Sequence, residues 1–278
     1  MKFYVALSDS LLAECSDLRE KTIKLGIISR AISIFRVERV NIYRDLLEAK
    51  GEYDLIEKIL KYQNTPQYLR KRLFLKEKEL KFAGLLPPLR TPHHKLLVPL
   101  KEIKEGEVRQ GYSFKKGGKF YVDLGLEKIF PLEDKKKEEG IVNVKFFGRF
   151  PNLYVKKIDK SEIKDYWGYE VKYYTSLKSL LSSHEGSFLL LTSKYGKDIS
   201  QHMKEIIDGL RSKNSLLLVF GSPRRGLFEI MRKEGINIKD YEPYIYNTLP
   251  DQGVETVRVE EALISTLAIL NLIRKLLK

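Results

Sequence analysis

The 278-residue chain is poor in the residues that build disulfide and metal sites. Cys15 is its only cysteine, which excludes an intramolecular disulfide and any zinc site made from several cysteines. Of the four histidines, His93 and His94 are adjacent but have no cysteine or carboxylate beside them, and His184 and His202 are isolated, so we expect no bound metal. No apolar run reaches the roughly 18 residues of a membrane-spanning helix, and the N-terminal MKFYVALSDS lacks a signal-peptide core. These absences predict a cytoplasmic protein without a structural metal.

Common nucleotide-binding and nucleophile motifs are missing as well. The sequence contains no G-x-G-x-x-G, no G-x-x-x-x-G-K-[ST] and no G-x-S-x-G. Dinucleotide, P-loop and serine-hydrolase chemistry therefore have no support. What remains favours a ligand that carries little phosphate and is held mostly by backbone groups.

Positive charge is in excess. Lys and Arg number 51 against 37 for Asp and Glu, which gives a formal net charge of +14. Such an excess favours a polyanionic partner, of which nucleic acid is the commonest. An anionic membrane surface is the weaker alternative.

Both ends of the chain alternate between strand-like and helix-like patterns, which predicts an α/β fold. MKFYVAL and VNIYRD have the composition of strands, whereas residues 9–24 and 68–84 show helical spacing. In SFLLLTSKYG (187–196) we expect a buried strand that leaves into a loop.

The middle of the chain is different in character. After the proline-rich LLPPLRTPHHK (85–95) come short β-branched and aromatic runs separated by glycines and charges, a pattern typical of a small antiparallel barrel or sandwich. We therefore predict one α/β domain formed by residues 1–91 and 163–278, with a β-rich domain inserted at 92–162.

Three segments share one design: LTSKYG (191–196), FGSPRRG (220–226) and YNTLPDQG (246–253). Each follows an apolar strand and combines glycine or proline with small polar side chains. Ligands of open α/β sheets bind beyond the carboxyl ends of the strands, so the three segments are candidates for one pocket. The alternative is that they are ordinary turns.

NTLPDQGVETVRVEEAL (247–263) resembles the last signature of the SPOUT superfamily of S-adenosylmethionine-dependent RNA methyltransferases. SRAISIFRVERVNIY, GLLPPLRTPHH, YWGYEV, LTSKYG and FGSPRRG occur in the order expected for an archaeal and eukaryotic branch, which carries an inserted OB-like barrel. The resemblance spans nearly the whole chain.

This resemblance implies a SPOUT-type α/β knot, with a deep C-terminal trefoil knot, a homodimer, and methylation of uridine N3 in ribosomal RNA. By position, it assigns contacts with S-adenosylmethionine to Thr192, Gly221, Asn247, Thr248, Leu249, Gln252 and Gly253. Other candidates from the same three segments are Leu191, Ser193, Phe220, Ser222, Gly226, Tyr246 and Thr256. The chain departs from its relatives at Pro223, Arg224 and Arg225, where smaller or uncharged residues are frequent.

Methylation of uracil N3 requires loss of its proton, which leaves negative charge on the neighbouring carbonyl oxygens. A fixed guanidinium or amide donor stabilises such charge. Arg30, which matches an arginine of the family, is our first catalytic candidate and also a candidate to contact RNA. Asn247 and Arg258 are the others, with structural roles as their alternatives. Asp251 and Glu255 are poor candidates for a general base.

Aromatic and basic residues are interleaved in FKKGGKFYV (114–122) and VKFFGRFPNLYVKK (144–157). Aromatic side chains stack on bases and basic ones bind phosphates. The predicted RNA-binding residues are Phe114, Lys116, Lys119, Tyr121, Lys145, Phe147 and Arg149. Because a strand alternates its faces, we expect about two of the three aromatic residues to be core.

Two other functions fit the same sequence. One is a ribosome-assembly factor that keeps the fold and binds RNA without catalysis. The other is a methyltransferase with a different acceptor, namely guanine N1 or a ribose 2′-oxygen of transfer RNA. Cofactor binding distinguishes the first from an enzyme, and the identity of the methylated nucleoside distinguishes the second.

Overall fold

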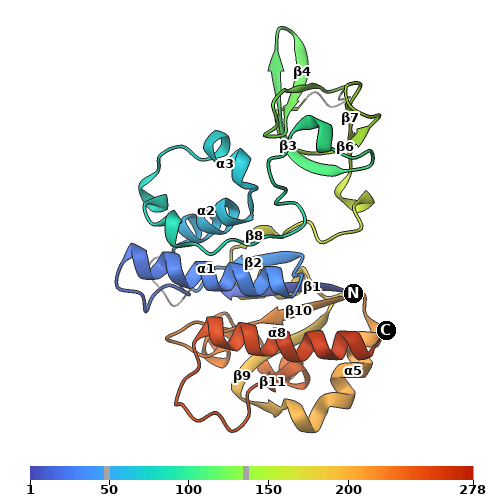
Figure 1. The fold of residues 1–278 in the computed structure, drawn as a ribbon. Helices are drawn as coiled ribbons and strands as arrows, with labels where there is room; N and C mark the ends of the chain where they lie inside the picture. Colours follow the sequence, from blue (N-terminus) through green and yellow to red (C-terminus); the bar gives the residue numbers. More distant parts are fainter. Residues whose placement is uncertain (47–50, 134–137, 278) are drawn as a thin grey trace. The chain divides into compact units, whose positions relative to one another are not determined.

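The computed structural model describes residues 1–46, 51–133 and 138–277, which form two compact units (Figure 1). The first unit comprises Met1–Lys61, Lys78–Pro87 and Tyr169–Lys278. The second comprises Tyr62–Glu77 and Pro88–Gly168. The chain therefore leaves the first unit and returns to it.

The first unit is built on a six-stranded parallel sheet. Its strand order is β11 (Ile245–Asn247), β9 (Phe188–Asp198), β10 (Ser215–Val219), β1 (Lys2–Ser8), β2 (Arg39–Tyr43) and β8 (Glu170–Tyr174). Central residues such as Val5 and Leu218 are fully buried, because helices cover both faces. Since all strands run in one direction, their carboxyl ends lie at the same end of the sheet.

Different helices cover the two faces. On one face, α4 (Leu177–Ser182) and α6 (Leu227–Lys233) pack into a core with Tyr43 and Val219, with α7 (Ile238–Tyr241) beside them. Strand alternation directs Phe3 and Phe188 to the other face, where Arg274 of α8 (Val259–Leu276) lies over Phe3 and Gly209 of α5 (Met203–Ser212) touches Phe188.

Helix α8 lies against α1 (Leu18–Ile34) (Figure 1). Within the described ranges, no helix is both long and apolar enough to cross a membrane.

The expected helix over residues 9–24 is wrong in its first half, because residues 9–14 form turns. The Asp17 side chain accepts a hydrogen bond from the Glu20 amide at 2.8 Å, and α1 begins immediately afterwards at Leu18. This N-cap satisfies an amide that the first helical turn leaves without a partner. The apolar residues before Asp17, including Leu11 and Leu12, are buried without being helical.

The single helix expected over 68–84 is also wrong. The structure has three short pieces there: α3 (Gln67–Leu73), η1 (Lys78–Leu80) and η2 (Ala83–Leu85), preceded by α2 (Tyr53–Asn64). Helix α3 ends because Phe74 adopts an extended backbone, and its ring packs edge-on against Tyr62 at 5.2 Å between centroids. Tertiary packing overrides the helical pattern at this point.

The second unit contains a five-stranded antiparallel sheet. Its order is β5 (Phe130–Pro131), β4 (Lys119–Asp123), β3 (Val108–Lys116), β6 (Gly140–Phe147) and β7 (Tyr154–Ile158). The outer strands β5 and β7 contact each other, so the sheet curls into a half-barrel around Val122, Val144 and Phe146. The structure confirms the prediction that the chain contains both an α/β fold and a small antiparallel sheet.

Four short 3₁₀ helices complete the fold: η3 (Leu100–Glu102), η4 (Lys160–Glu162), η5 (Ile199–His202) and η6 (Glu242–Tyr244). In the second unit, the carbonyl oxygen of Asn64 lies within hydrogen-bond distance of two imidazoles, His93 Nε2 at 2.7 Å and His94 Nε2 at 2.9 Å. Burial lowers the pKa of His93 to about 3, so the ring stays neutral. Both rings donate to the carbonyl and hold the end of α2.

Candidate functional site

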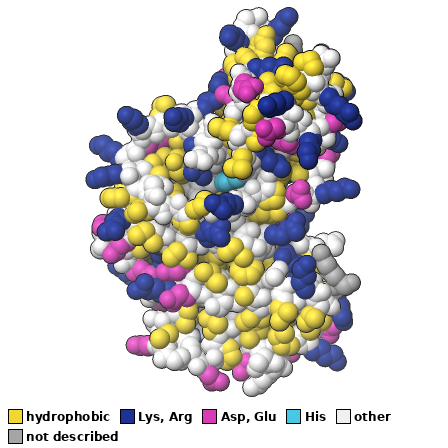
Figure 2. Space-filling view, viewed as in Figure 1, with side chains coloured by type: hydrophobic (Ala, Val, Ile, Leu, Met, Phe, Trp, Pro, Cys, Tyr) yellow, Lys and Arg dark blue, Asp and Glu magenta, His cyan; other side chains and the backbone are white. Residues whose placement is uncertain are grey.

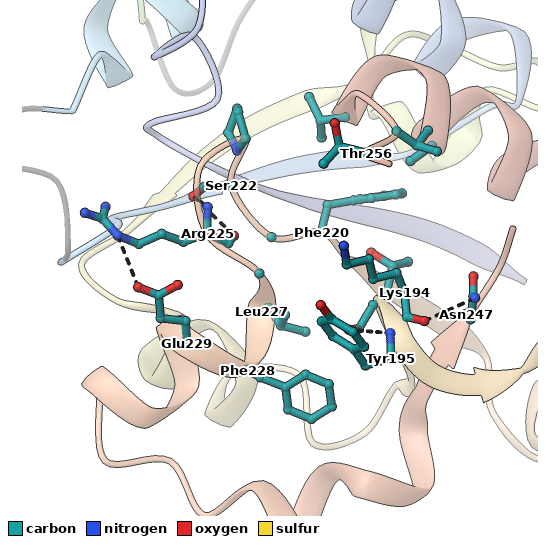
Figure 3. A pocket seen from close by; sticks show the side chains of 18 of the residues that line it. Lys194, Tyr195, Phe220, Ser222, Arg225, Leu227, Phe228, Glu229, Asn247 and Thr256 are labelled. Atoms are coloured by element: carbon teal, nitrogen blue, oxygen red, sulfur yellow. Dashed lines mark hydrogen bonds and ion pairs between the residues drawn. The ribbon is translucent and has the colours of Figure 1, made fainter. Parts of the chain in front are cut away.

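A cavity of about 690 Å³ opens in the first unit beside residues 192–195 of β9 and the ends of β10 and β11 (Figure 3). Its walls come from the three segments singled out in the sequence, together with the first turns of α6 and α8. This volume lies within the range of small-molecule sites. The cavity is therefore the candidate functional site.

The first wall is a bulge inside β9, not a loop after it. Ile245 of β11 pairs with Leu191, but the next residue, Tyr246, pairs with Lys197, so residues 192–196 have no counterpart in β11. The expectation that the strand leaves into a loop at LTSKYG is therefore wrong, since β9 continues to Asp198. A bulge turns side chains away from the regular pleat, and here it turns them toward the cavity.

The bulge depends on Gly196. A Cβ atom there would lie 2.6 Å from the carbonyl carbon of Tyr246 and 2.8 Å from the amide nitrogen of Asn247. Only glycine allows two backbones to approach so closely. The backbone at the end of the bulge is therefore held against β11.

Three further hydrogen bonds fix the bulge. The Asn247 amide group donates to the carbonyl oxygen of Lys194 at 3.3 Å, and the Tyr195 amide donates to Ser193 Oγ at 3.2 Å (Figure 3). Thr192 Oγ1 donates to the carbonyl oxygen of Val219 at 3.0 Å, which joins the first wall to the end of β10.

The second wall, residues 220–226, is anchored in the core of the sheet. The buried hydroxyl of Tyr43 donates to the carbonyl oxygen of Phe220 at 2.6 Å. Complete burial raises the pKa of Tyr43 well above its ordinary value, so the phenol keeps its proton and remains a donor. Ser222 and Arg225 close the turn through a 3.0 Å bond from the Ser222 amide to the Arg225 carbonyl.

The third wall connects β11 to α8. Its Leu249 amide donates to Asn247 Oδ1 at 3.0 Å, and the hydroxyls of Thr248 and Thr266 share a buried 2.7 Å hydrogen bond. The Gln252 amide group donates to the carbonyl oxygens of Val254 and Glu255 at 2.8 and 3.0 Å. The wall is thus shaped by its own side chains and is tied to α8.

The lining offers three kinds of contact. Apolar side chains include Phe220, Leu249 and Val259, and hydroxyl groups come from Thr192, Ser222 and Thr256. Basic side chains, among them Lys194 and Arg232, stand at the same cavity. This set suits a ligand with a flat apolar part, hydroxyl groups and a carboxylate.

Most predicted cofactor residues are brought together by the structure. The cavity is lined by Thr192, Ser193, Phe220, Gly221, Ser222, Gly226, Asn247, Thr248, Leu249, Gln252 and Thr256. Three predicted residues do not line it. Leu191 is buried in the core below, Tyr246 is buried with its hydroxyl 3.3 Å from Glu205, and Gly253 is exposed.

Of the catalytic candidates, only Asn247 lines the cavity. Arg30 lies on α1 and is partly buried. Arg258 is the exposed residue directly before α8, and its amide donates to Glu261 Oε2 at 2.9 Å. Their catalytic roles stay predictions.

Sequence reasoning missed several lining residues. They are Lys194, Tyr195, Leu227, Phe228, Glu229, Arg232, Val257, Val259 and Ala262, in addition to the basic turn Pro223, Arg224 and Arg225. Most belong to the first turns of α6 and α8, directly after the predicted segments. A helix that begins at a binding loop presents its first turn to the ligand, and this signal was available in the sequence.

In the second unit, the expectation that about two of three aromatic residues are core is wrong. Phe114, Tyr121 and Phe147 are all partly exposed, because they alternate with the buried Ser113, Val122 and Phe146. The basic candidates Lys116, Lys119 and Arg149 are exposed, and Lys145 is partly so. In Figure 2, basic and hydrophobic side chains are interspersed over the visible face of this unit.

Neighbouring aromatic residues extend this surface. The rings of Phe147 and Tyr154 stack at 5.6 Å with 18° between their planes, and the amines of Lys145 and Lys156 lie 5.8 and 5.3 Å from the Phe147 centroid. Phe114 faces Tyr121 across the β3–β4 pair. We call Lys145, Phe147, Tyr154 and Lys156 the β6–β7 platform.

Comparisons with known proteins bear on this site. Residues 2–270 match the family model described as "Putative RNA methyltransferase". An uncharacterized protein of Haloarcula marismortui is 32% identical over 96% of this chain and 98% of its own length. The human 28S rRNA (uridine-N(3))-methyltransferase is 30% identical over 96% of this chain and 77% of its own length. A mouse protein of the same name is 29% identical over 96% of this chain and 75% of its own length.

Replacement of Gly196 by alanine tests the construction of the bulge. We expect Gly196→Ala to lower the free energy of unfolding by about 1–3 kcal/mol, because the added methyl group overlaps the backbone of β11. Urea denaturation followed by circular dichroism measures this. Gly186→Ala is the matched control, since an added methyl group there would meet no described atom within 4 Å beyond its chain neighbours. Equal effects of the two substitutions would contradict the role assigned to Gly196.

Proposed function

Because this chain belongs to the RNA methyltransferase family whose model it matches, we propose that it methylates N3 of a uridine in ribosomal RNA, using S-adenosylmethionine bound in the three-walled cavity. The observation that carries the proposal is that the family match, residues 2–270, includes every wall of a cavity built for a small ligand. The acceptor follows from the relatives named as uridine-N3-methyltransferases.

The lining fits S-adenosylmethionine by its chemistry. Phe220, Leu249 and Val259 suit the adenine ring, and the backbone of the third wall can read its edge. Hydroxyl groups such as Thr192 and Thr256 suit the ribose, and a basic side chain such as Arg224 suits the methionine carboxylate.

A deep trefoil knot is part of this proposal. Strand β11 lies at one edge of the sheet, whereas α8, which follows it, packs against α1. The connection, residues 248–258, lines the same cavity as residues 220–226, so the two segments pass close to each other. Threading of α8 past that second wall accounts for this path.

A homodimer through α1 and α8 is also proposed. Ile23, Ile27 and Ile34 lie at helical spacing on α1 and are 38–56% exposed. On the adjacent α8, Ile264 and Leu272 are 40% and 62% exposed. Exposed apolar residues on two packed helices form a patch of the kind that a second subunit covers. A second copy is the occupant we choose, because the two helices meet side by side.

Arg30 belongs to the same stripe of α1, three residues after Ile27 and four before Ile34. In the proposed dimer its guanidinium would reach the second subunit. We assign it the role of stabilising negative charge on the uracil carbonyl oxygens, with Asn247 orienting the base and Arg258 as a further donor. Such donors act without giving up a proton.

S-adenosylmethionine held by the three walls would supply the methyl group as an electrophile and leave as S-adenosylhomocysteine, and the uracil N3 proton would pass to solvent water. The protein contributes mainly by holding the acceptor nitrogen in line with the methyl carbon. The hydrogen bonds that fix the three walls prepare this geometry in advance.

RNA capture is assigned to the second unit, including the OB-like insertion predicted at residues 92–162. In its β6–β7 platform, Lys145 and Lys156 lie beside the Phe147 ring. In the partly exposed Phe114–Tyr121 pair, the Arg72 guanidinium lies 4.2 Å from the centroid of the Phe114 ring. Stacking on a base contributes about 1–3 kcal/mol per base and does not depend on its identity.

The decisive experiment incubates the protein with methyl-labelled S-adenosylmethionine and ribosomal RNA that lacks the modification, and then identifies the labelled nucleosides. We expect label in 3-methyluridine. Label in 1-methylguanosine or a 2′-O-methylated nucleoside would overturn the acceptor. No label, and no gain in stability when the cofactor is added, would favour the non-catalytic assembly factor. At about 100 times its Kd, a bound cofactor adds ~2.7 kcal/mol of stability.

Arg30→Ala is expected to lower kcat about 100-fold, the size of effect seen when one charge-stabilising donor is removed, with Arg30→Lys in between. Single-turnover methylation measures this, and cofactor affinity should stay unchanged. Arg19→Ala, an exposed arginine on the same helix, is the control. Full turnover by Arg30→Ala would remove this residue from the mechanism.

The β6–β7 platform yields a separate prediction. Loss of Lys145 and Lys156 together should reduce the slope of log affinity against log salt by about 1.4, since each phosphate contact with a single strand contributes about 0.7. Filter binding at several salt concentrations measures the slope. Loss of the exposed Lys101 and Lys104 together serves as the control. An unchanged slope in the platform variant would place the RNA elsewhere.

A further inference from the structure

Tyr195 is 76% exposed, which is more than any other aromatic side chain in the part of the chain that the structure describes. It lines the cavity, whereas other tyrosines of the same unit, such as Tyr43 and Tyr246, are 0% and 2% exposed. A large ring that faces water at a cavity forgoes the stabilisation that burial gives. The folded protein alone does not explain its position.

The ring is presented on a rigid support. The amide of Tyr195 is bonded to Ser193, the carbonyl of Lys194 is bonded to Asn247, and Gly196 lies against the backbone of β11. The bulge therefore fixes the backbone on both sides of Tyr195. Pre-organisation of this kind lowers the entropy cost of binding a partner to the ring.

The surroundings of Tyr195 combine apolar and basic groups. Figure 3 shows its ring on the cavity side of β9, in the space bordered by Phe220 and Phe228. The Lys194 amine lies 5.2 Å from the ring centroid, and the exposed Arg232 lines the same cavity. An aromatic face with cations beside it matches a nucleobase and its flanking phosphates.

We propose that Tyr195 is the stacking platform for the target base, which enters the cavity flipped out of its RNA, while Lys194 contacts a neighbouring phosphate. This inference rests on the proposed function, because it names the subsite that the acceptor uracil occupies. The N3 atom of a paired uracil lies on its Watson–Crick edge, so methylation requires the base to be unpaired and exposed. Extrusion costs a few kcal/mol, which stacking on Tyr195 offsets in part.

The test compares Tyr195→Ala, Tyr195→Phe and the control Tyr244→Ala, which removes a 37% exposed tyrosine that does not line the cavity. We expect Tyr195→Ala to lower kcat/KM for RNA 10- to 100-fold, roughly the range that loss of one stacked base allows. Tyr195→Phe should keep most of the activity, since it keeps the ring. Cofactor affinity by calorimetry should be unchanged in all three, and thermal stability should be unchanged in the two Tyr195 variants.

Photocrosslinking gives a readout that does not need turnover. RNA in which uridines are replaced by 4-thiouridine should crosslink to the peptide carrying Tyr195 in the wild-type protein. A merely structural role for Tyr195 predicts no such crosslink. Weaker cofactor binding by Tyr195→Ala, with normal RNA kinetics, would instead place the ring against the cofactor and overturn the inference.

The two proposals fail in different ways. If the wild type methylates RNA and Tyr195→Ala does so equally well, the stacking role is refuted and the proposed function is retained. A crosslink at Tyr195 without methylation of any RNA would refute the function and support the base-binding subsite. If the wild type shows neither methylation of RNA nor a crosslink at Tyr195, the proposed function and the stacking role are both refuted.

Discussion

The close approach of two backbones at Gly196 is the constraint on which the site depends. Because no side chain separates β9 from β11 there, five residues of β9 can bulge out while the strand resumes its pairing at Lys197. The bulge provides one wall of the cavity, and Asn247, which holds it, begins another. A single point of contact between two strands thus sets the relative position of two walls.

Much of the site could be predicted from the sequence because the physics that places it is local. In a parallel sheet, glycine- and proline-bearing segments at the carboxyl ends of apolar strands lie at the same end of the sheet. Most residues predicted in those segments line the cavity. The first turns of α6 and α8 were missed although they adjoin the same segments. Phe228 and Val259 follow directly from where those helices begin.

Other features depend on partners that are distant in the sequence. Nothing in LTSKYG reveals that β11 pairs on both sides of it, so a bulge looked like a loop. The three predicted aromatic residues, Phe114, Tyr121 and Phe147, lie on one face because of the strand register. Phe114 is paired with Tyr121, and Val108, on the same face of β3 as Phe114, is paired with Lys145, two residues before Phe147. The sequence shows how core-facing and outward-facing residues alternate within each strand. The pairing of strands decides which residues of neighbouring strands lie side by side on one face.

The hydrogen bond from Tyr43 to Phe220 joins residues 177 positions apart in the chain. The pairing of β1 with β10 is similarly distant, whereas β3 pairs with β4 after a turn of two residues. Contacts of high sequence separation form slowly, because a long loop must close before they stabilise anything. The antiparallel sheet is therefore expected to fold early, and the cavity to take shape among the last events of folding.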